Sequence, residues 1–104
     1  MQVITREKRD KKEKTQLIPR YRVILLDDND HTYEYVIEML GKIFGHSPST
    51  AFKMAREVDI TGKVVVDRTH KERAEMKRDQ IHAYGPDWRL VHSQESMSAV
   101  LEKD

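Results

Sequence analysis

Apolar and polar residues follow two repeating patterns along the chain, and together these patterns predict six elements of secondary structure. Residues 21–26 form a nearly unbroken apolar run rich in β-branched side chains, which predicts a strand. Residues 32–44 place apolar side chains at helical spacing, so we expect one face of this helix to be buried. Asp30 or Thr32 is the expected N-cap, and Gly45 is expected to end the helix.

A second helix and a second strand are predicted next. Ser47 is the expected N-cap, and Pro48 suits the first helical position because the N–H group that proline lacks would be unpaired there anyway. The apolar stripe then predicts a helix that runs to about residue 59. Residues 63–67, with three consecutive valines, predict a short strand.

The remaining chain predicts one more helix and one more strand. Thr69 and Glu72 match a capping box, which predicts a third helix that runs to about residue 84. A Gly-Pro pair at residues 85–86 stops this helix, and residues 97–102 predict a last strand. The order strand, helix, helix, strand, helix, strand, with the helices on one face of the sheet, indicates a two-layer α+β domain.

Charge divides the chain into two regions. Charged residues make up 36% of the 104 residues, well above the usual share of about a quarter. Residues 1–20 contain seven Lys or Arg and three Asp or Glu, whereas the remaining 84 residues contain 12 basic and 15 acidic side chains. We therefore expect residues 1–19 to be a flexible charged tail, either solubilising or partner-binding, and residues 20–104 to form one domain.

Missing residue types exclude several classes of protein. The chain has no cysteine, which excludes a disulfide scaffold, a thiolate zinc site, an iron–sulfur cluster and a cysteine nucleophile. No apolar run approaches the roughly 18 residues of a membrane-spanning helix. The N-terminus also lacks the apolar segment of a secretion signal. We therefore expect a cytoplasmic protein with no membrane association.

Patterns typical of catalysis and cofactor binding are also missing. The five histidines form no close pair at helical spacing, and we expect them at the surface or in turns. The four glycines are isolated, which argues against a phosphate-binding loop, and no serine lies in a nucleophile elbow. We therefore expect no catalytic residue, no metal, no cofactor and no enzymatic activity.

The strongest local signal is the acidic turn, residues 27–30 (Asp-Asp-Asn-Asp), between the first predicted strand and helix. These residue types favour turns and helix caps, because their short side chains accept hydrogen bonds from nearby backbone N–H groups. Clustered carboxylates also bind metal ions or ammonium groups. An EF-hand is excluded because its glycine and its bidentate Glu are missing. Composition alone leaves capping and cation binding both open.

Several stretches, taken in order, resemble the ClpS family, whose members are adaptors that deliver substrates with destabilising N-terminal residues to the Clp ATPase–protease. The matching stretches are YRVILLDDN at 21–29, TYEYVIEML at 32–40, TGKVVV at 61–66, AEMK at 74–77 and SMSAVLE at 96–102. The resemblance covers about residues 20–104, apart from the loop around Trp88. It implies a ClpS-like fold, with a three-stranded antiparallel sheet packed against three helices in the order β-α-α-β-α-β.

The resemblance also implies a site for the α-amino group of a substrate. In the family, an Asn-Asp-Asp motif at the strand end and a His at the end of the second helix hold this amine. The corresponding residues here are Asp27, Asp28, Asn29 and Asp59, and only Asp28 keeps the family residue. Asp27 and Asp59 still supply charged acceptors, which suit an ammonium group with its three donors.

A pocket for the side chain of that N-terminal residue is implied between the first and second helices. Its wall positions fall on Tyr33, Val36, Ala55, Val58 and Met97, which are all apolar or aromatic. Tyr33 stands where the family often has Met and is expected to narrow the entrance, whereas Ala55 is expected to widen one wall. The expected ligand side chain is Phe, Tyr, Trp or Leu. Plain core packing is the alternative role for these five residues.

The resemblance implies partners as well. Glu72, Glu75 and Lys77 match the helix that docks on the N-terminal domain of the Clp ATPase in the family, and the tail suits a role in delivery. The expected protein is a monomer that binds this domain and substrate proteins, and we expect no nucleic-acid partner. Two alternatives remain open. One is a ClpS-like module that has lost or altered N-terminal-residue recognition, and the other is nucleic-acid or ribosome association through the basic tail, with steep salt dependence.

Overall fold

The computed structural model describes residues 18–104, so the predicted tail at residues 1–19 lies almost entirely outside the described part of the chain. The elements are β1 (Arg20–Leu26), α2 (Tyr33–Phe44), α3 (Pro48–Thr61), β2 (Lys63–His70), α4 (Lys71–His82) and β3 (Ala99–Lys103). This order confirms the predicted α+β arrangement of three strands and three helices. Within these residues, no helix is both long and apolar enough to cross a membrane.

The apolar strand β1 lies at the centre of the sheet. It pairs with β2 on one side and with β3 on the other, and both pairings are antiparallel. The register with β2 shifts between Val23 and Ile24, where an irregularity interrupts the ladder. A strand that is paired on both sides has no free edge, which suits a sequence whose second half, residues 23–26, is entirely apolar.

All three helices pack on one face of this sheet. The core combines alternate positions of the strands with residues of every helix: Val23, Leu25, Val64, Val66 and Ala99, with Tyr35, Val36, Met39, Leu40, Ala51, Ala55, Val58, Ala74 and Ile81. The intervening strand residues, such as Ile24 and Val100, lie outside this cluster, because successive side chains of a strand point to opposite faces. The result is the predicted two-layer architecture.

The ends of α2 and α3 follow the sequence signals. The side-chain hydroxyl of Thr32 accepts a hydrogen bond from Tyr35 N–H, which makes Thr32, and not Asp30, the N-cap of α2. Gly45 (φ 74°) and Gly62 (φ 90°) take the left-handed conformation that ends each helix. Gly62 as the C-cap extends α3 to Thr61, two residues beyond the predicted end.

The predicted capping box at Thr69 is wrong. Arg68, Thr69 and His70 continue β2, because they pair with the first three residues of β1. His70 therefore becomes the N-cap of α4, and its Nδ1 accepts from Arg73 N–H. Long-range pairing with a strand far away in sequence overrides the local capping pattern.

The last helix and strand also differ slightly from their predicted bounds. Helix α4 ends at His82, two residues early, where Ala83 N–H bonds back to the carbonyl of Asp79. Strand β3 begins at Ala99 and not at residue 97, since Met97 and Ser98 still belong to the connection from α4. The Ser98 carbonyl nevertheless accepts from Leu26 N–H.

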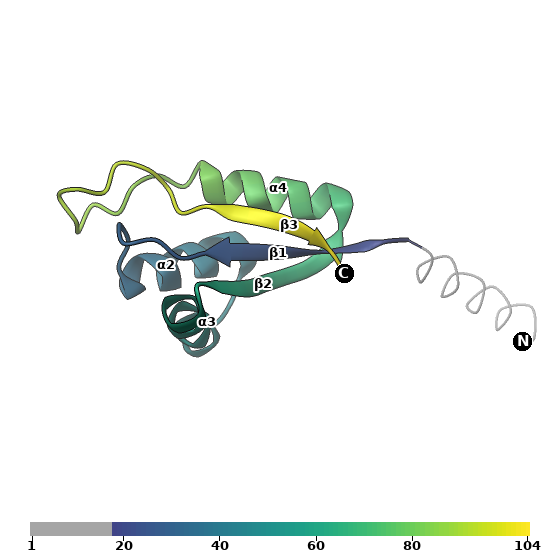
Figure 1. Ribbon diagram of the computed structural model, residues 1–104, viewed down its shortest axis with the longest axis horizontal. Coiled ribbons are helices and arrows are strands. Elements are labelled where there is room, and N and C mark those ends of the chain that lie inside the picture. Colours follow the sequence, from purple (N-terminus) through teal and green to yellow (C-terminus); the bar gives the residue numbers. More distant parts are fainter. Residues whose placement is uncertain (1–17) are drawn as a thin grey trace, which may run out of the picture.

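One end of the molecule gathers several segments that are far apart in the sequence. The end of β1, the acidic turn, the start of α2 and the connection between α4 and β3 all lie there, as Figure 1 shows. This connection, residues 83–98, is called the long loop below. In the view of Figure 1 it extends beyond the end of β1. Side chains distant in sequence therefore meet at this end.

Candidate functional site

Asp27, Tyr33 and Asp59 converge at this end of the sheet. Tyr33 is the first residue of α2, and its hydroxyl donates a 2.7 Å hydrogen bond to Asp59 Oδ2 in the last turn of α3. Asp27 follows β1 directly, and its N–H bonds to the carbonyl of Gly62 at the end of α3, 3.0 Å away. The exposed carboxylates of Asp27 and Asp59 thus lie beside the Tyr33 hydroxyl. These three side chains form the rim of the candidate site.

The charge of this rim acts on Tyr33. The hydrogen bond to Asp59 raises the pKa of the Tyr33 hydroxyl above its usual 10.0, and partial burial and the negative charges of Asp59 and Asp27 act in the same direction. Arg56 opposes this shift. A phenolate is disfavoured where negative charge gathers, and a positive group is favoured at the same place.

Replacing Asp59 by Asn should move the pKa of Tyr33 back toward 10.0. The substitution removes the charge that both accepts the hydrogen bond and repels a phenolate. The ring 13C shift of Tyr33, followed by NMR from pH 8 to pH 12, measures this change. Asp30→Asn is the matched control, because Asp30 belongs to the same acidic turn but faces His92. An equal shift in both variants would contradict the assigned contact.

Four of the five predicted pocket residues are packed in the interior. Val36, Ala55, Val58 and Met97 are each at most 4% exposed. Tyr33 is partly buried and packs against this core, with its ring centroid 5.9 Å from that of Phe52 on α3. Val36 lies about one turn beyond Tyr33 on α2, and Ala55 lies one turn beyond Phe52 on α3. Tyr33 therefore sits across the seam between α2 and α3, above small and apolar side chains.

Asp28 is engaged by a histidine within the chain. Its Oδ1 lies 2.6 Å from His31 Nδ1 and also accepts from Asp30 N–H. His31 Nε2 lies 2.7 Å from the backbone carbonyl of Glu95, an atom that can only accept. Asp28 therefore links the acidic turn to the long loop.

His31 lies in the turn between β1 and α2, which agrees with the expectation of histidines at the surface or in turns, but its side chain is buried. The side chain of His31 is only 3% exposed, and its ring packs 4.4 Å from that of Tyr35. The sequence contains no signal for this burial, because the carbonyl partner is 64 residues away. The other member of the predicted amine site, Asn29, is exposed, and its carbonyl faces His92 Nε2 at 3.3 Å.

Asp87 holds the long loop against the start of α2. Its side chain has no exposed surface. Oδ2 accepts from the N–H and the hydroxyl of Thr32, both at 2.7 Å, and Oδ1 accepts from Arg89 N–H at 3.0 Å and from Arg89 Nη1 at 3.3 Å. Sequence reasoning missed this residue, since an Asp after Gly-Pro is typical of an exposed turn.

The three predicted docking residues of α4 have different environments. Glu72 is exposed and Glu75 is half-buried. Lys77 is 8% exposed, and its ammonium donates to the carbonyl of Ile43 near the end of α2. It also lies 5.5 Å from the centroid of the Phe44 ring. The ammonium of Lys77 is thus already bound within the chain.

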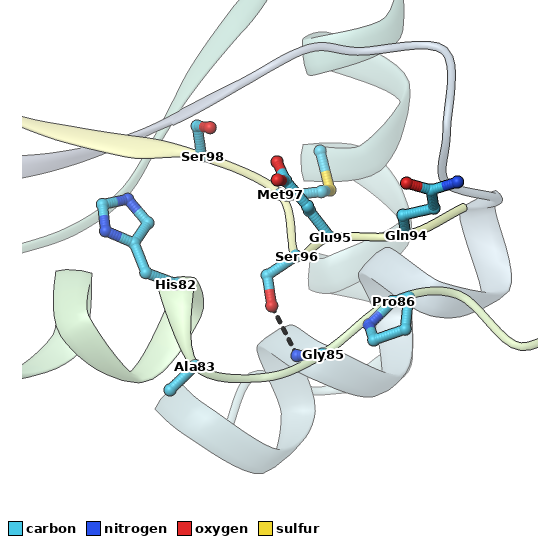
Figure 2. A pocket seen from close by; sticks show the side chains of 9 residues that line it. All are labelled: His82, Ala83, Gly85, Pro86, Gln94, Glu95, Ser96, Met97 and Ser98. Carbon is cyan, nitrogen blue, oxygen red and sulfur yellow. Dashed lines mark hydrogen bonds between the residues drawn. The ribbon is translucent and has the colours of Figure 1, made fainter. Parts of the chain in front are cut away.

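A separate hollow of about 470 Å³ lies between the end of α4 and the stretch that leads into β3. Figure 2 shows its lining, in which the Ser96 hydroxyl accepts from Gly85 N–H. Met97 is the only predicted pocket residue among those that line it. The other lining residues are mostly polar, so this hollow is not the apolar pocket expected between α2 and α3. Among residues 18–104, no three potential ligands are grouped as a metal site requires.

Known proteins resemble this chain in sequence. The family model described as "ATP-dependent Clp protease adaptor protein ClpS" matches residues 16–87. The ATP-dependent Clp protease adapter protein ClpS of Ruegeria sp. (strain TM1040) is 33% identical over 91 residues, which span 88% of this chain and 76% of that protein. The protein of the same name from Roseobacter denitrificans (strain ATCC 33942 / OCh 114) is 36% identical over 70 residues, which span 67% of this chain and 62% of the relative.

A solved structure resembles the chain in fold. The structure of Agrobacterium tumefaciens ClpS2 bound to L-phenylalaninamide superposes with a TM-score of 0.68 and covers 84% of this chain and 99% of that one. The sequence identity is 22%, so this similarity concerns the fold alone. It agrees with the three-stranded antiparallel sheet and three helices described above.

Proposed function

The chain belongs to the ClpS family of adaptors of the ATP-dependent Clp protease, and from this premise we propose that it binds the N-terminal residue of substrate proteins and delivers them to a Clp ATPase. Members of the family are non-catalytic adaptors, so the chain is not an enzyme. The proposed ligand is a free α-amine with a bulky apolar side chain. The observation that carries the proposal is the convergence of Asp27, Tyr33 and Asp59 on one rim.

The amine is proposed to replace the Tyr33 hydroxyl as the donor to Asp59. An ammonium group carries three donors and a positive charge, and charge-assisted hydrogen bonds are about twice as strong as neutral ones. Asp27 lies close enough to act on Tyr33 electrostatically and supplies a second charged acceptor. Asp28, paired with His31, shapes the turn that presents Asp27.

The apolar side chain of the ligand is proposed to enter the seam that Tyr33 covers. Rotation of Tyr33 away from Asp59 opens the seam toward Val36, Ala55 and Val58, which are apolar and of small or moderate size. The amine and the side chain of the ligand then replace the hydroxyl and the ring of Tyr33, respectively. L-phenylalaninamide, to which the A. tumefaciens relative is bound, has this combination of a free α-amine and an aromatic ring.

Docking on the N-terminal domain of the ATPase is proposed for the outer face of α4. Glu72 is exposed there, Glu75 is half-buried, and Met76, which follows Glu75, is 45% exposed on the same helix. The start of α4 lies at the far end of the helix from the long loop, so a substrate and the ATPase can occupy different ends of the molecule. Delivery by the tail remains a prediction, because residues 1–17 are outside the described part.

A titration with a fluorescently labelled peptide that begins with Phe tests the function. We expect a dissociation constant on the order of micromolar, or about −8 kcal/mol, followed by anisotropy. The same peptide with an acetylated N-terminus should bind at least ten times more weakly, because acetylation removes the charge and leaves a single N–H donor. Removal of residues 1–19 should leave this binding intact. Equal affinity for both peptides would refute recognition of the amine.

One observation favours the alternative module that has lost this recognition. The Tyr33 hydrogen bond to Asp59 and the burial of Val36, Ala55 and Val58 leave little space in the seam. If peptides beginning with Phe, Tyr, Trp and Leu all fail to bind, while the chain still binds the ATPase N-terminal domain, the alternative function is the correct one. The same set of peptides therefore separates the two functions.

A further inference from the structure

The long loop presents exposed apolar side chains. Trp88 is 81% exposed and Val91 is fully exposed, although both residue types usually bury much of their surface. The family model matches only as far as residue 87, so these two residues lie beyond the stretch it describes. Arg89 lies against Trp88, with its guanidinium carbon 4.6 Å from the ring centroid. Trp and Arg are the residue types most often found at the energetic centre of protein interfaces.

The loop backbone that carries these side chains is held in place. Asp87 bonds to Thr32 on one side and to Arg89 on the other. Asp87 N–H donates to the hydroxyl of Ser93 at 2.9 Å, and Arg89 Nη2 donates to Glu38 Oε2 at 3.0 Å. A surface that is ordered before binding loses less conformational entropy when a partner arrives. Trp88 and Val91 are therefore presented on a preorganised support.

The same loop adjoins the proposed amine site. His92 Nε2 lies 3.3 Å from the Asn29 carbonyl and 3.5 Å from Asp30 Oδ1, and His31 bonds to the Glu95 carbonyl. The loop thus touches the acidic turn at several points, and Figure 1 shows both at one end of the molecule. A substrate whose first residue is held at the rim continues its chain over this end.

From these contacts we propose that Trp88, Arg89 and Val91 form a second binding surface for the substrate, which takes an apolar side chain from the few residues that follow its N-terminal residue. This inference rests on the proposed function. The substrate is a better occupant than the ATPase, because the loop touches the acidic turn and is separated from Glu72 by nearly the whole of α4, about 15 Å. An extended peptide spans about 3.3–3.6 Å per residue, so a few residues reach beyond the acidic turn.

The experiment compares a long ligand with a short one. The long ligand is a labelled, tryptophan-free hexapeptide with N-terminal Phe and Leu at positions 3 to 5, followed by anisotropy, and the short one is L-phenylalaninamide, measured by competition. We expect the hexapeptide to bind at least ten times more tightly than L-phenylalaninamide. We also expect it to change the emission of Trp88, which is the only tryptophan in the chain.

The Trp88→Ala variant should lose the tighter binding of the hexapeptide and keep its affinity for L-phenylalaninamide within about twofold. Val91→Ser should reproduce the effect more weakly, while Val100→Ala, an exposed valine on the opposite face of the sheet, should change nothing. If L-phenylalaninamide binds but the affinity of the hexapeptide does not depend on Trp88, the inference is overturned and the proposed function stays intact. Failure of both ligands would overturn both. Loss of ATPase binding alone in Trp88→Ala would make the surface a docking site for the ATPase and would also overturn the inference.

Discussion

Asparagine in place of Asp87 is expected to destabilise the fold by about 3 kcal/mol at pH 7. Each oxygen of the buried carboxylate accepts two hydrogen bonds, one pair from Thr32 and one pair from Arg89. Asparagine keeps one oxygen and places an NH2 group where the other was, so one pair of donors faces another donor. Unfolding in urea, followed by circular dichroism, measures the change.

Asp79→Asn is the matched control for this substitution. Its carboxylate is 67% exposed and contacts only the neighbouring Arg78, so its loss should change stability by less than about 0.5 kcal/mol. Hydrogen exchange locates the effect, because the amides of Thr32 and Arg89 both donate to Asp87 and should lose protection in Asp87→Asn. If the two variants are equally stable, the carboxylate does not support the loop.

The contribution of Asp87 is also expected to depend on pH. Burial alone raises the pKa of this carboxyl, but the hydrogen bonds from Thr32 and Arg89 outweigh burial and lower the pKa from 3.8 to about 2. As the pH falls, the unfolded chain therefore takes up the proton first. The stabilisation, about 2 kcal/mol, is fully present above about pH 4 and is lost as the pH falls toward 2. The stability difference between the wild type and Asp87→Asn should shrink over the same range.

Much of the fold follows from local patterns in the sequence. The apolar stripe of residues 32–44 and Gly45 place α2 within a residue, because a helix depends on contacts between near neighbours and on its caps. The end of β2 was missed because it depends on pairing with Arg20 and its neighbours, about 50 residues away. The same reason explains why the Thr69 capping pattern failed and His70 caps α4.

The candidate site was predictable only in part. The residue types single out the acidic turn, and the family resemblance alone points to Asp59; the structure brings Asp27 and Asp59 to one rim with Tyr33. The burial of His31 and Asp87 was not predictable. Each is a polar residue in a turn, and each is buried by contacts that include a partner more than 50 residues away. The local sequence does not reveal such partners, because contacts between a turn and a distant segment follow no fixed spacing in the sequence.

Removing both carboxylates of the rim is expected to weaken binding of a Phe peptide at least 100-fold. Hydrogen bonds to charged groups contribute about 1.5–3 kcal/mol each, and about 1.4 kcal/mol changes affinity tenfold. Asp27→Asn and Asp59→Asn should therefore each weaken binding at least about tenfold, and the double variant should combine the two losses. Both side chains are exposed, so the fold should tolerate the changes. Anisotropy with the labelled Phe peptide measures all three variants.

The Asp30→Asn variant is the control for charge in the same turn. Its carboxylate faces His92 at 3.5 Å and not the Tyr33 hydroxyl, so affinity should change less than twofold. A general attraction between an acidic surface and a positive peptide would instead make all three aspartates similar and would fade with added salt. Equal losses in Asp30→Asn and Asp59→Asn would therefore contradict a specific amine site.

Histidine in place of Asp59 tests whether a neutral hydrogen-bond acceptor is sufficient at this position or whether a negative charge is needed. The resemblance to the family places a histidine at this position, and a neutral imidazole nitrogen can accept a hydrogen bond without carrying a negative charge. If the amine needs an acceptor at the end of α3, Asp59→His should bind the Phe peptide within about tenfold of the wild type at pH 8, whereas Asp59→Ala should not. Because Asp27 supplies a second negative charge beside Tyr33, we expect Asp59→His, like Asp59→Asn, to lose about tenfold in affinity, and Asp59→Ala, which has no acceptor, to lose more. Failure of Asp59→His together with Asp59→Ala would mean that this rim binds the amine through its paired carboxylates.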